Sequence, residues 1–177
     1  LKERINLFKE SCDEARKKLQ NARLSIAMIG TTSAGKSTIV NALIGRRIAP
    51  IDSGEMSGGV LILRDADHCH LTVNEAEGAP WKGGKWSDLS DKKTYSYLRN
   101  HVMKPYHETR KSRECSVPHA IFSGPILPAR DKELLGLPSD LGVELIDLPG
   151  LKSVQDQTNL AVIQNQVHRA FSLVALD

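Results

Sequence analysis

One stretch of the sequence decides the fold of this chain: Gly30-Thr31-Thr32-Ser33-Ala34-Gly35-Lys36-Ser37-Thr38. Its spacing, G-x-x-x-x-G-K-S, is typical of a loop that binds phosphate groups. An apolar run of strand length precedes it at 24–29, and an apolar helical pattern follows at 39–44 and ends at Gly45. In a strand, glycine loop and helix of this order, backbone N–H groups converge on one point at the helix N-terminus. The stretch therefore predicts a binding site for a nucleoside triphosphate.

The side chains of this loop have different expected tasks. Lys36 is expected to reach the β- and γ-phosphates, and the hydroxyl of Ser37 to bind Mg²⁺. The alternative, a glycine-rich turn that matches the pattern by chance, is disfavoured by the strand and the helix on either side. The nucleotide-binding residues predicted on the loop are Thr32, Ser33, Ala34, Gly35, Lys36, Ser37 and Thr38.

The composition is that of an ordinary globular protein. With 177 residues the chain can form one domain with a hydrophobic core, and its 40% apolar and 25% charged residues exclude a disordered chain. No apolar run approaches the roughly 20 residues that cross a bilayer, and the charged N-terminus does not resemble a signal peptide. The net charge of +3 is too small to argue for nucleic acid, which is not expected as a partner. Three widely spaced cysteines, Cys12, Cys69 and Cys115, suit the reducing cytoplasm.

Residues 1–22 form a separate predicted element, an amphipathic helix. Its apolar residues are spaced alternately by four and three, as in a coiled-coil seam: Leu1, Ile5, Phe8, Cys12, Ala15, Leu19 and Ala22. A single helix of this kind is marginal in water. We expect it to pair with a helical segment from beyond Asp177 or from another subunit; in the alternative, it lies back on the sheet of its own domain.

Strands and helices alternate along residues 23–177, the second predicted domain. Strand patterns stand at 24–29, 60–63, 70–74, 120–122, 142–147 and 171–177. Helical patterns stand at 39–44, from a cap at Asp88 or Ser90 to about Met103, and at 157–170. This order predicts an α/β fold, a P-loop NTPase domain of three layers with a mostly parallel sheet, preceded by the amphipathic helix. We expect the strand at 70–74 to be the antiparallel neighbour of the strand at 60–63, and the run at 171–177 to be a core strand. Because no base-reading N/T-K-x-D element follows, the domain is expected to be incomplete at its C-terminal end.

Three segments each allow two interpretations. Trp81 and Trp86, in the irregular stretch 75–87, either mark a binding surface or fasten the loop to the body of the domain. The basic residues between Arg99 and Arg113 favour a solvated face over a nucleic-acid patch, because no aromatic residues are interleaved with them. The run His68-Cys69-His70 suggests zinc, but no C-x-x-C or H-x₃-H pair accompanies it, so ordinary polar histidines are favoured.

A second motif, Asp147-Leu148-Pro149-Gly150, follows an apolar strand late in the chain. An aspartate at that place can hold Mg²⁺ through water, and the amide of Gly150 can meet a γ-phosphate and sense its loss. A D-x-P-G sequence alone is weak evidence, because Pro-Gly turns are common. After a P-loop, in the proper order, it becomes strong, so Asp147 and Gly150 join the predicted nucleotide site.

With these motifs the chain resembles the dynamin superfamily of large GTPases, and in particular the bacterial dynamin-like proteins. The resemblance covers roughly residues 24–177 and is carried by Gly30–Thr38, the loop that ends at Ser57, and Leu145–Leu151. It implies a guanine nucleotide (GTP and GDP), Mg²⁺, and GTP hydrolysis promoted by homodimerisation through the G domain. It also implies helical bundles formed by the flanking segments, and membrane remodelling by a cytoplasmic protein that acts at a lipid surface.

The resemblance assigns roles by position. Ser33 matches the P-loop serine that stabilises charge between the phosphates, and Ser57 matches the switch-I threonine that closes on Mg²⁺ and orients water. The implied catalytic residues are Ser33, Lys36 and Ser57, and the implied metal ligands are Ser37, Ser57 and Asp147. Two departures bear on the rate of hydrolysis: Thr32 stands where eukaryotic dynamins have glutamine, and Ser57 replaces threonine.

Other functions stay open at this point. A scaffold that is gated by GTP or GDP, with little hydrolysis, is compatible with the departures at Thr32 and Ser57. A translation-type GTPase is disfavoured by the N-terminal heptads and by the context of the Leu-Pro-Gly motif. An ATPase stays open because the chain contains no base-reading element. The stretch 75–135 is interpreted as an insertion whose role the sequence does not assign.

Overall fold

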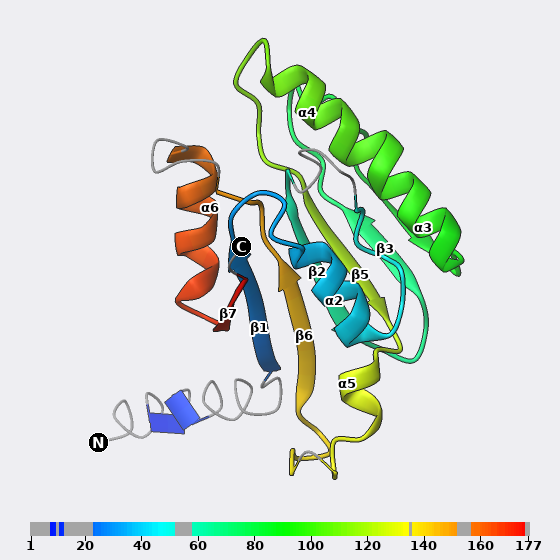
Figure 1. Cartoon of the computed structure of the whole chain (residues 1–177). Helices are drawn as coiled ribbons and strands as arrows, with labels where there is room; N and C mark the ends of the chain where they lie inside the picture. The colour runs from blue at the N-terminus through cyan, green and yellow to red at the C-terminus, as the bar shows by residue number, and fades with distance from the viewer. Residues whose placement is uncertain are drawn as a thin grey trace.

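The structure, a computed structural model, describes residues 8–9, 11–12, 23–51, 58–134, 136–151 and 157–175 (Figure 1). Of the predicted N-terminal helix, Phe8, Lys9, Ser11 and Cys12 belong to this set; all four are helical and exposed. The rest of the predicted a/d seam lies outside the described residues. Ser57 lies outside them too.

The centre of the fold is a seven-stranded sheet in the order β4-β3-β5-β2-β6-β1-β7. Its strands are β1 (Arg23–Gly30), β2 (Val60–Asp65), β3 (His70–Val73), β4 (Gly84–Ser87), β5 (His119–Gly124), β6 (Gly142–Asp147) and β7 (Phe171–Ala175). Strand β1 runs parallel to both β6 and β7, which places the P-loop at the end of a parallel sheet half. Strand β2 runs antiparallel to β6 but parallel to β5, and β3 runs antiparallel to both β5 and β4. The predicted α/β class is confirmed, with its parallel pairing concentrated around β1.

The expected pairing of the strands at 60–63 and 70–74 is wrong. Strand β5 lies between them, with Ala120 beside Leu61 on one edge and beside Val73 on the other. Both edges of β2 are occupied by strands from later in the chain, β5 and β6, so β3 joins the sheet outside β5. The short connection that follows β2 favours a hairpin locally, but the long-range pairs decide the order.

The helices are α2 (Lys36–Ile44), α3 (Asp91–Tyr97), the π-helical turn η1 (Leu98–Met103), α4 (Lys104–Arg110), α5 (Leu127–Arg130) and α6 (Gln157–Val167). The elements α3, η1 and α4 follow one another without a break and form one long helix, capped at its start by the Ser90 hydroxyl, which accepts from the amide of Lys93. The sequence pattern predicts that this helix ends near Met103, but it continues through α4 to Arg110. Pro105 lies just after η1; in a regular helix its ring would clash with the carbonyl four residues back, and the wider π turn relieves that clash.

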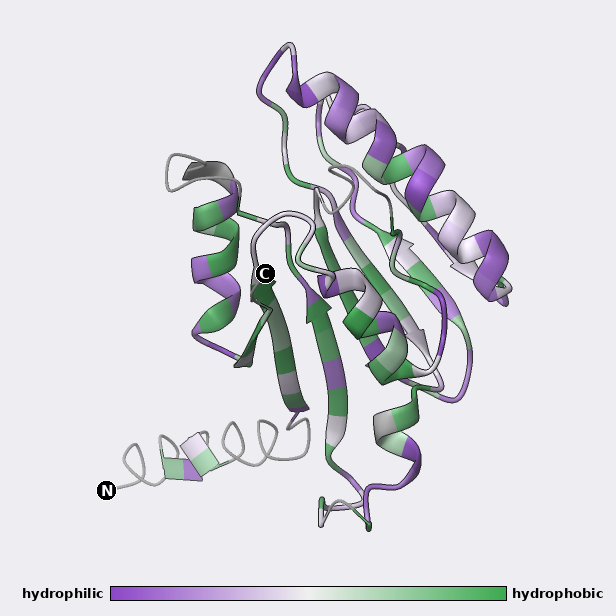
Figure 2. Ribbon diagram, in the orientation of Figure 1, coloured by the Kyte–Doolittle hydropathy of each residue, from purple (hydrophilic) through white to green (hydrophobic). Residues whose placement is uncertain are grey.

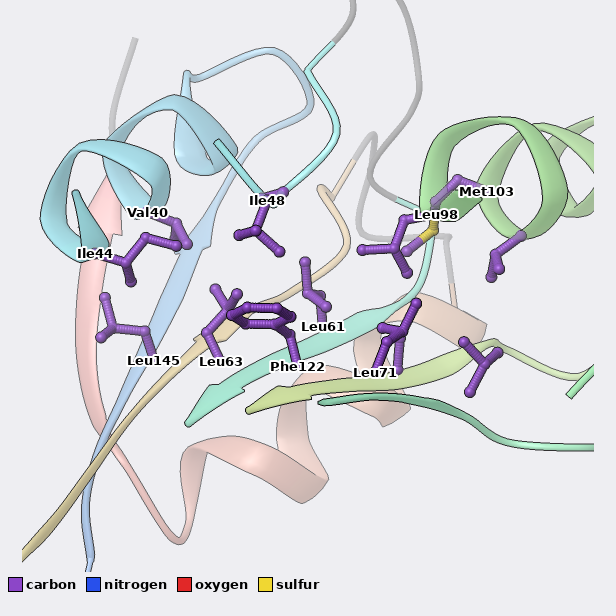
Figure 3. Packing of buried hydrophobic residues seen from close by; sticks show 14 of the residues in the cluster. Val40, Ile44, Ile48, Leu61, Leu63, Leu71, Leu98, Met103, Phe122 and Leu145 are labelled. Carbon is purple, nitrogen blue, oxygen red and sulfur yellow. The ribbon is translucent and has the colours of Figure 1, made fainter. Parts of the chain in front are cut away.

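The domain has three layers, as predicted. Helix α2 and the long helix cover one face of the sheet and α6 covers the other, and the strands between them are largely apolar (Figures 1 and 2). On the first face, Val40, Ile44 and Ile48 pack over Leu61, Leu63 and Phe122 from the strands (Figure 3). On the second face, Ile163 of α6 packs with Ala27 and Ile146. Side chains that alternate along β1 and β6 thus serve two separate cores.

The two tryptophans fasten their loop to the body of the domain. Trp81 is buried, its Nε1 donates to the carbonyl of Asn74 at 3.0 Å, and its ring meets Tyr106 edge-on. Trp86 lies on β4 with its ring centroid 4.5 Å from that of Tyr97. Of the two interpretations of these residues, the structure supports the anchor.

Strand β7 is not the core strand that its composition suggests. It pairs with β1 at the edge of the sheet, and Phe171 and Val174 are 72% and 56% exposed. Helix α6 lies over Ala27 and Ile146, on β1 and β6, and so leaves β7 largely uncovered. The strand was predicted correctly, and its burial was not.

Candidate functional site

The P-loop has the backbone that its sequence requires. Strand β1 ends at Gly30 and α2 begins at Lys36. Between them Ser33 and Gly35 both have left-handed backbones, with φ of 71° and 74°. A left-handed serine is uncommon and is a mark of functional loops. Together these turns form a concave backbone that ends at the first-turn amides of α2, which have no acceptor within the helix.

The Lys36 side chain lies inside this loop. Only 3% of the residue is exposed, and its Nζ donates to the carbonyls of Thr31 at 2.6 Å and Gly30 at 3.2 Å. Both acceptors belong to the loop itself. The ammonium is therefore held at the place where the oxygens of a bound phosphate would meet the loop.

Ser37 and Asp147 meet beneath the loop, although they are 110 positions apart in the sequence. The Ser37 hydroxyl donates to Oδ2 of Asp147 at 2.6 Å. Burial raises the pKa of Asp147 to about 6, while the hydroxyl and the Lys36 ammonium act in the opposite direction. The second carboxylate oxygen, Oδ1, is buried and has no hydrogen-bond partner among the described residues. A buried carboxylate with an unused oxygen, next to a hydroxyl, is a donor set that fits Mg²⁺.

Gly150 lies directly against the P-loop. The amide of Thr32 donates to the carbonyl of Leu151, and the amide of Leu151 donates to the carbonyl of Gly30, both at 3.3 Å. A Cβ on Gly150 would lie 2.7 Å from Cα of Thr32 and 2.8 Å from its Oγ1, so only glycine fits. The two sequence motifs therefore form one site, with the Thr32 side chain packed on Gly150.

The structure brings together nine of the ten predicted site residues. On the loop and the first turn of α2 are Thr32, Ser33, Ala34, Gly35, Lys36, Ser37 and Thr38; Asp147 ends β6, and Gly150 follows it. Ser57 is outside the described part of the chain. Its neighbour Gly58 packs on α4, where a Cβ would lie 2.6 Å from both Nε2 of His107 and Cδ1 of Tyr106.

Asn159 belongs to this site although no motif pointed to it. It is 3% exposed, its Nδ2 donates to the carbonyl of Gly150 at 3.1 Å, and Nη1 of Arg110 lies 3.5 Å from its Oδ1. A sequence signal exists: Asn159 stands four residues before Ile163, on the apolar face of the predicted helix. A polar residue on such a face indicates a specific buried partner.

Other polar groups of interest lie away from the loop. In the described part of the chain, no three His, Cys, Asp or Glu side chains gather as metal ligands would. Nδ1 of His70 lies 3.1 Å from the Ser87 hydroxyl, and the guanidinium of Arg46 contacts Sγ of Cys69. A hollow of about 550 Å³ lies beside α4, lined in part by Arg110, and is distinct from the P-loop.

A strand, a glycine loop with left-handed turns, a helix, and a facing aspartate define this chain as a P-loop α/β protein. The model of the dynamin family matches residues 26–176, which is most of the chain. The chain therefore belongs to the dynamin family.

Two curated relatives illustrate how far the similarity extends. The bacterial dynamin-like protein of Nostoc punctiforme is 24% identical over 148 residues, which are 84% of this chain and 20% of that protein. The isoniazid-induced protein IniC of Mycobacterium tuberculosis is 46% identical over 55 residues, 31% of this chain and 11% of that protein. The chain thus spans a fifth or less of the length of these two relatives.

A similar solved structure comes from work on an oligomerised bacterial dynamin pair that senses and tethers membranes. It is 19% identical with a TM-score of 0.46, and the match covers 92% of this chain and 22% of that one. Within the described residues of this chain, no helix is both long enough and apolar enough to cross a membrane.

Proposed function

We propose that this chain is a dynamin-type G domain that binds GTP with Mg²⁺, hydrolyses it, and couples the cycle to self-association at a membrane surface in the cytoplasm. The observation that carries the nucleotide part is the hydrogen bond of 2.6 Å between Ser37 and Asp147 beneath the loop that holds Lys36. The choice of guanine, the self-association and the membrane are supported by membership of the dynamin family.

Each residue of the site has a definite task in this proposal. Lys36 exchanges the carbonyls of Gly30 and Thr31 for β- and γ-phosphate oxygens, which offer it full negative charge. Ser37 and Asp147 would hold Mg²⁺, which neutralises charge on the phosphate oxygens when it is bound. The amide of Gly150 donates to the γ-phosphate.

Two serines complete the proposed machinery. Ser33, held in its left-handed turn, supports the charge that develops between the phosphates. Ser57 positions the attacking water and contributes to the metal site. Hydrolysis then depends chiefly on preorganised charge and orientation, as is general for phosphoryl transfer.

The first test is the loss of the Lys36 ammonium. We expect Lys36→Ala to weaken binding of a fluorescent GTP analogue by at least about tenfold, because no other side chain of the motif directs positive charge at the β- and γ-phosphates. Lys85→Ala, at an exposed position on β4, is the matched control and should bind like the parent. Equal affinity in Lys36→Ala and the parent would refute the site.

The coupling is tested by the rate of phosphate release. The rate per molecule should rise with protein concentration, and rise further with anionic vesicles, if association and a membrane promote hydrolysis. ATP in place of GTP, and EDTA in place of Mg²⁺, should abolish it. A rate that is independent of concentration and of lipid would contradict the proposed coupling.

A second candidate is a GTP-gated scaffold with little hydrolysis. It is favoured by Thr32, whose short side chain packs against Gly150 where eukaryotic dynamins carry a glutamine. Tight GTP binding with a low, concentration-independent rate of phosphate release would select this candidate over the enzyme.

A further inference from the structure

Among the described residues, the buried polar side chains fall into two groups. Lys36, Ser37 and Asp147 belong to the nucleotide motifs, whereas Thr94, Glu144 and Asn159 do not. Burying an amide costs free energy unless its N–H and carbonyl groups are bonded. Of the second group, Asn159 is the one that bonds to a motif residue, Gly150.

Asn159 and the P-loop both contact Gly150. Nδ2 of Asn159 donates to its carbonyl at 3.1 Å. The backbone of Thr32 lies so close that a Cβ on Gly150 would be 2.7 Å from Cα of Thr32. Gly150, whose amide is to meet the γ-phosphate, is therefore held at its carbonyl by a side chain that comes from α6.

Arg110 of α4 determines which end of that amide faces Gly150. A guanidinium has only N–H donors, so its approach to Oδ1 of Asn159, at 3.5 Å, leaves Nδ2 to face the carbonyl. The opposite orientation would place a carbonyl oxygen against a carbonyl oxygen and an amide group against a guanidinium. Helix α4 thereby reaches the Gly150 peptide through one intermediate residue.

The same helix also touches Gly58, the residue after Ser57. Tyr106 and His107 of α4 lie against the backbone of Gly58, which follows Ser57. One helix therefore contacts the chain beside Ser57 directly and the chain at Gly150 through Asn159. No contact of α4 with the P-loop is needed for it to influence both.

We propose that Asn159 is a positioning residue that holds Gly150 for the γ-phosphate, and that Arg110 orients its amide. The inference rests on the proposed function, because it assigns Gly150 the task of sensing that phosphate. It predicts an effect confined to ligands that carry a γ-phosphate, since Gly150 has no role toward GDP.

The test compares steady-state hydrolysis and nucleotide affinity in variants of the purified protein. Asn159→Asp keeps the shape but replaces the donor with an acceptor, so it should lower kcat at least about tenfold and weaken a non-hydrolysable GTP analogue similarly. Its affinity for GDP should stay within about twofold of the parent, which a merely structural defect would not allow. Asn100→Asp makes the same chemical change at an exposed position of η1 and should behave like the parent.

Arg110→Met tests the second half of the proposal without altering the buried amide. It should lower kcat about threefold, and the double variant with Asn159→Ala should equal Asn159→Ala alone, because Arg110 acts through Asn159. Additive effects would overturn the role of Arg110. Arg113→Met, which removes a neighbouring arginine that bonds to the Gly78 carbonyl instead, is its control.

The outcomes separate this inference from the proposed function. An active parent whose Asn159→Asp variant keeps the parental kcat, or loses GDP and GTP affinity equally, overturns the positioning role alone. A parent that fails to bind GTP in the presence of Mg²⁺, with Lys36→Ala indistinguishable from it, overturns the proposed function and the inference together.

Discussion

At the scale of single residues, the chemistry of the site depends on the protonation of Asp147. Its carboxylate is buried, one oxygen accepts from Ser37, and the other has no hydrogen-bond partner in the described part of the chain. Burial raises its pKa to about 6, so the folded protein holds this proton more tightly than an exposed aspartate does. A bound divalent cation would reverse that preference.

The sign of the resulting pH dependence follows from this shift. Between the ordinary aspartate pKa of 3.8 and the folded pKa of about 6, the native state binds more protons than the unfolded state. Without metal, the contribution of Asp147 to stability is therefore largest below about pH 4 and is lost as the pH rises through about 6. This pKa shift limits the contribution of Asp147 to the free energy of unfolding to the order of 3 kcal/mol.

We expect Asp147→Asn, which cannot ionise, to keep this contribution to its stability as the pH rises. In EDTA, its free energy of unfolding relative to the parent should increase between about pH 4 and about pH 7. Mg²⁺ should stabilise the parent at about pH 7 and leave the variant unchanged. Denaturant unfolding measures both, with Asp140→Asn at an exposed position as the control. A difference that does not vary with pH would contradict the assignment.

Single residues of the two motifs could be predicted because their patterns are local. From Gly30 to Thr38, and again from Asp147 to Gly150, the chemistry lies within a few consecutive positions. Asn159 could not be found in this way. Its meaning depends on Arg110, which is 49 positions earlier in the chain, and no spacing rule relates the two.

At the scale of elements, the end of α2 is fastened by Arg46, the residue that follows the predicted stop at Gly45. Its guanidinium forms a two-pronged contact with Asp91 at the start of α3 and donates to the carbonyl of Pro125 at 3.1 Å. It also lies over the ring of Phe122. One side chain thus ties the helix behind the P-loop to α3 and to the end of β5.

We expect Arg46→Met to lower the free energy of unfolding by about 2 kcal/mol, because it removes several hydrogen bonds made by a partly buried guanidinium. Arg46→Lys should recover only part of this, since an ammonium cannot form the forked contact with Asp91. Arg47→Met, which removes a contact with the Tyr95 ring, is the neighbouring control and should cost less. Urea denaturation compares the three, and equal losses at the two arginines would argue against this role of Arg46.

Helix starts and stops were predicted better than the long helix itself. Ser90 caps α3 and Gly45 ends α2 with φ of 70°, as their residue types favour. The continuation to Arg110 does not follow from the sequence pattern, because a proline such as Pro105 is unfavourable inside a regular helix. The π turn that accommodates it depends on packing, with Leu98, Val102 and Met103 all buried against the core.

At the scale of the whole molecule, layers were predictable and strand neighbours were not. An alternating apolar pattern indicates that a strand is buried, but it does not indicate which strand lies beside it. The order β3-β5-β2 requires His119–Gly124 to enter between two strands that are close in sequence. Similarly, the apolar composition of residues 171–177 predicts a buried strand. The strand is exposed instead because it lies at the edge of the sheet.

The exposed edge has a consequence for the behaviour of the purified chain. Strand β7 presents Phe171, Leu173 and Val174, and among the described residues its backbone pairs with β1 alone. Such edges invite pairing with other chains. Val174→Lys should therefore reduce light scattering on concentration. Leu134→Lys, which makes the same kind of change at an exposed turn, should not. A comparable reduction in both variants would attribute the effect to net charge rather than to the edge.

The π turn in the long helix sets the rotational phase of everything that follows it. A π turn bonds each residue to the fifth along instead of the fourth, so it holds more residues per turn than an α-helix does. If Leu98–Met103 became a regular α-helix of the same length, α4 would therefore face in a different direction. Tyr95, before the turn, would keep its hydrogen bonds to the backbone of Ile51. Arg110 would then no longer face Asn159, and a change of phase within one helix would uncouple α4 from Gly150.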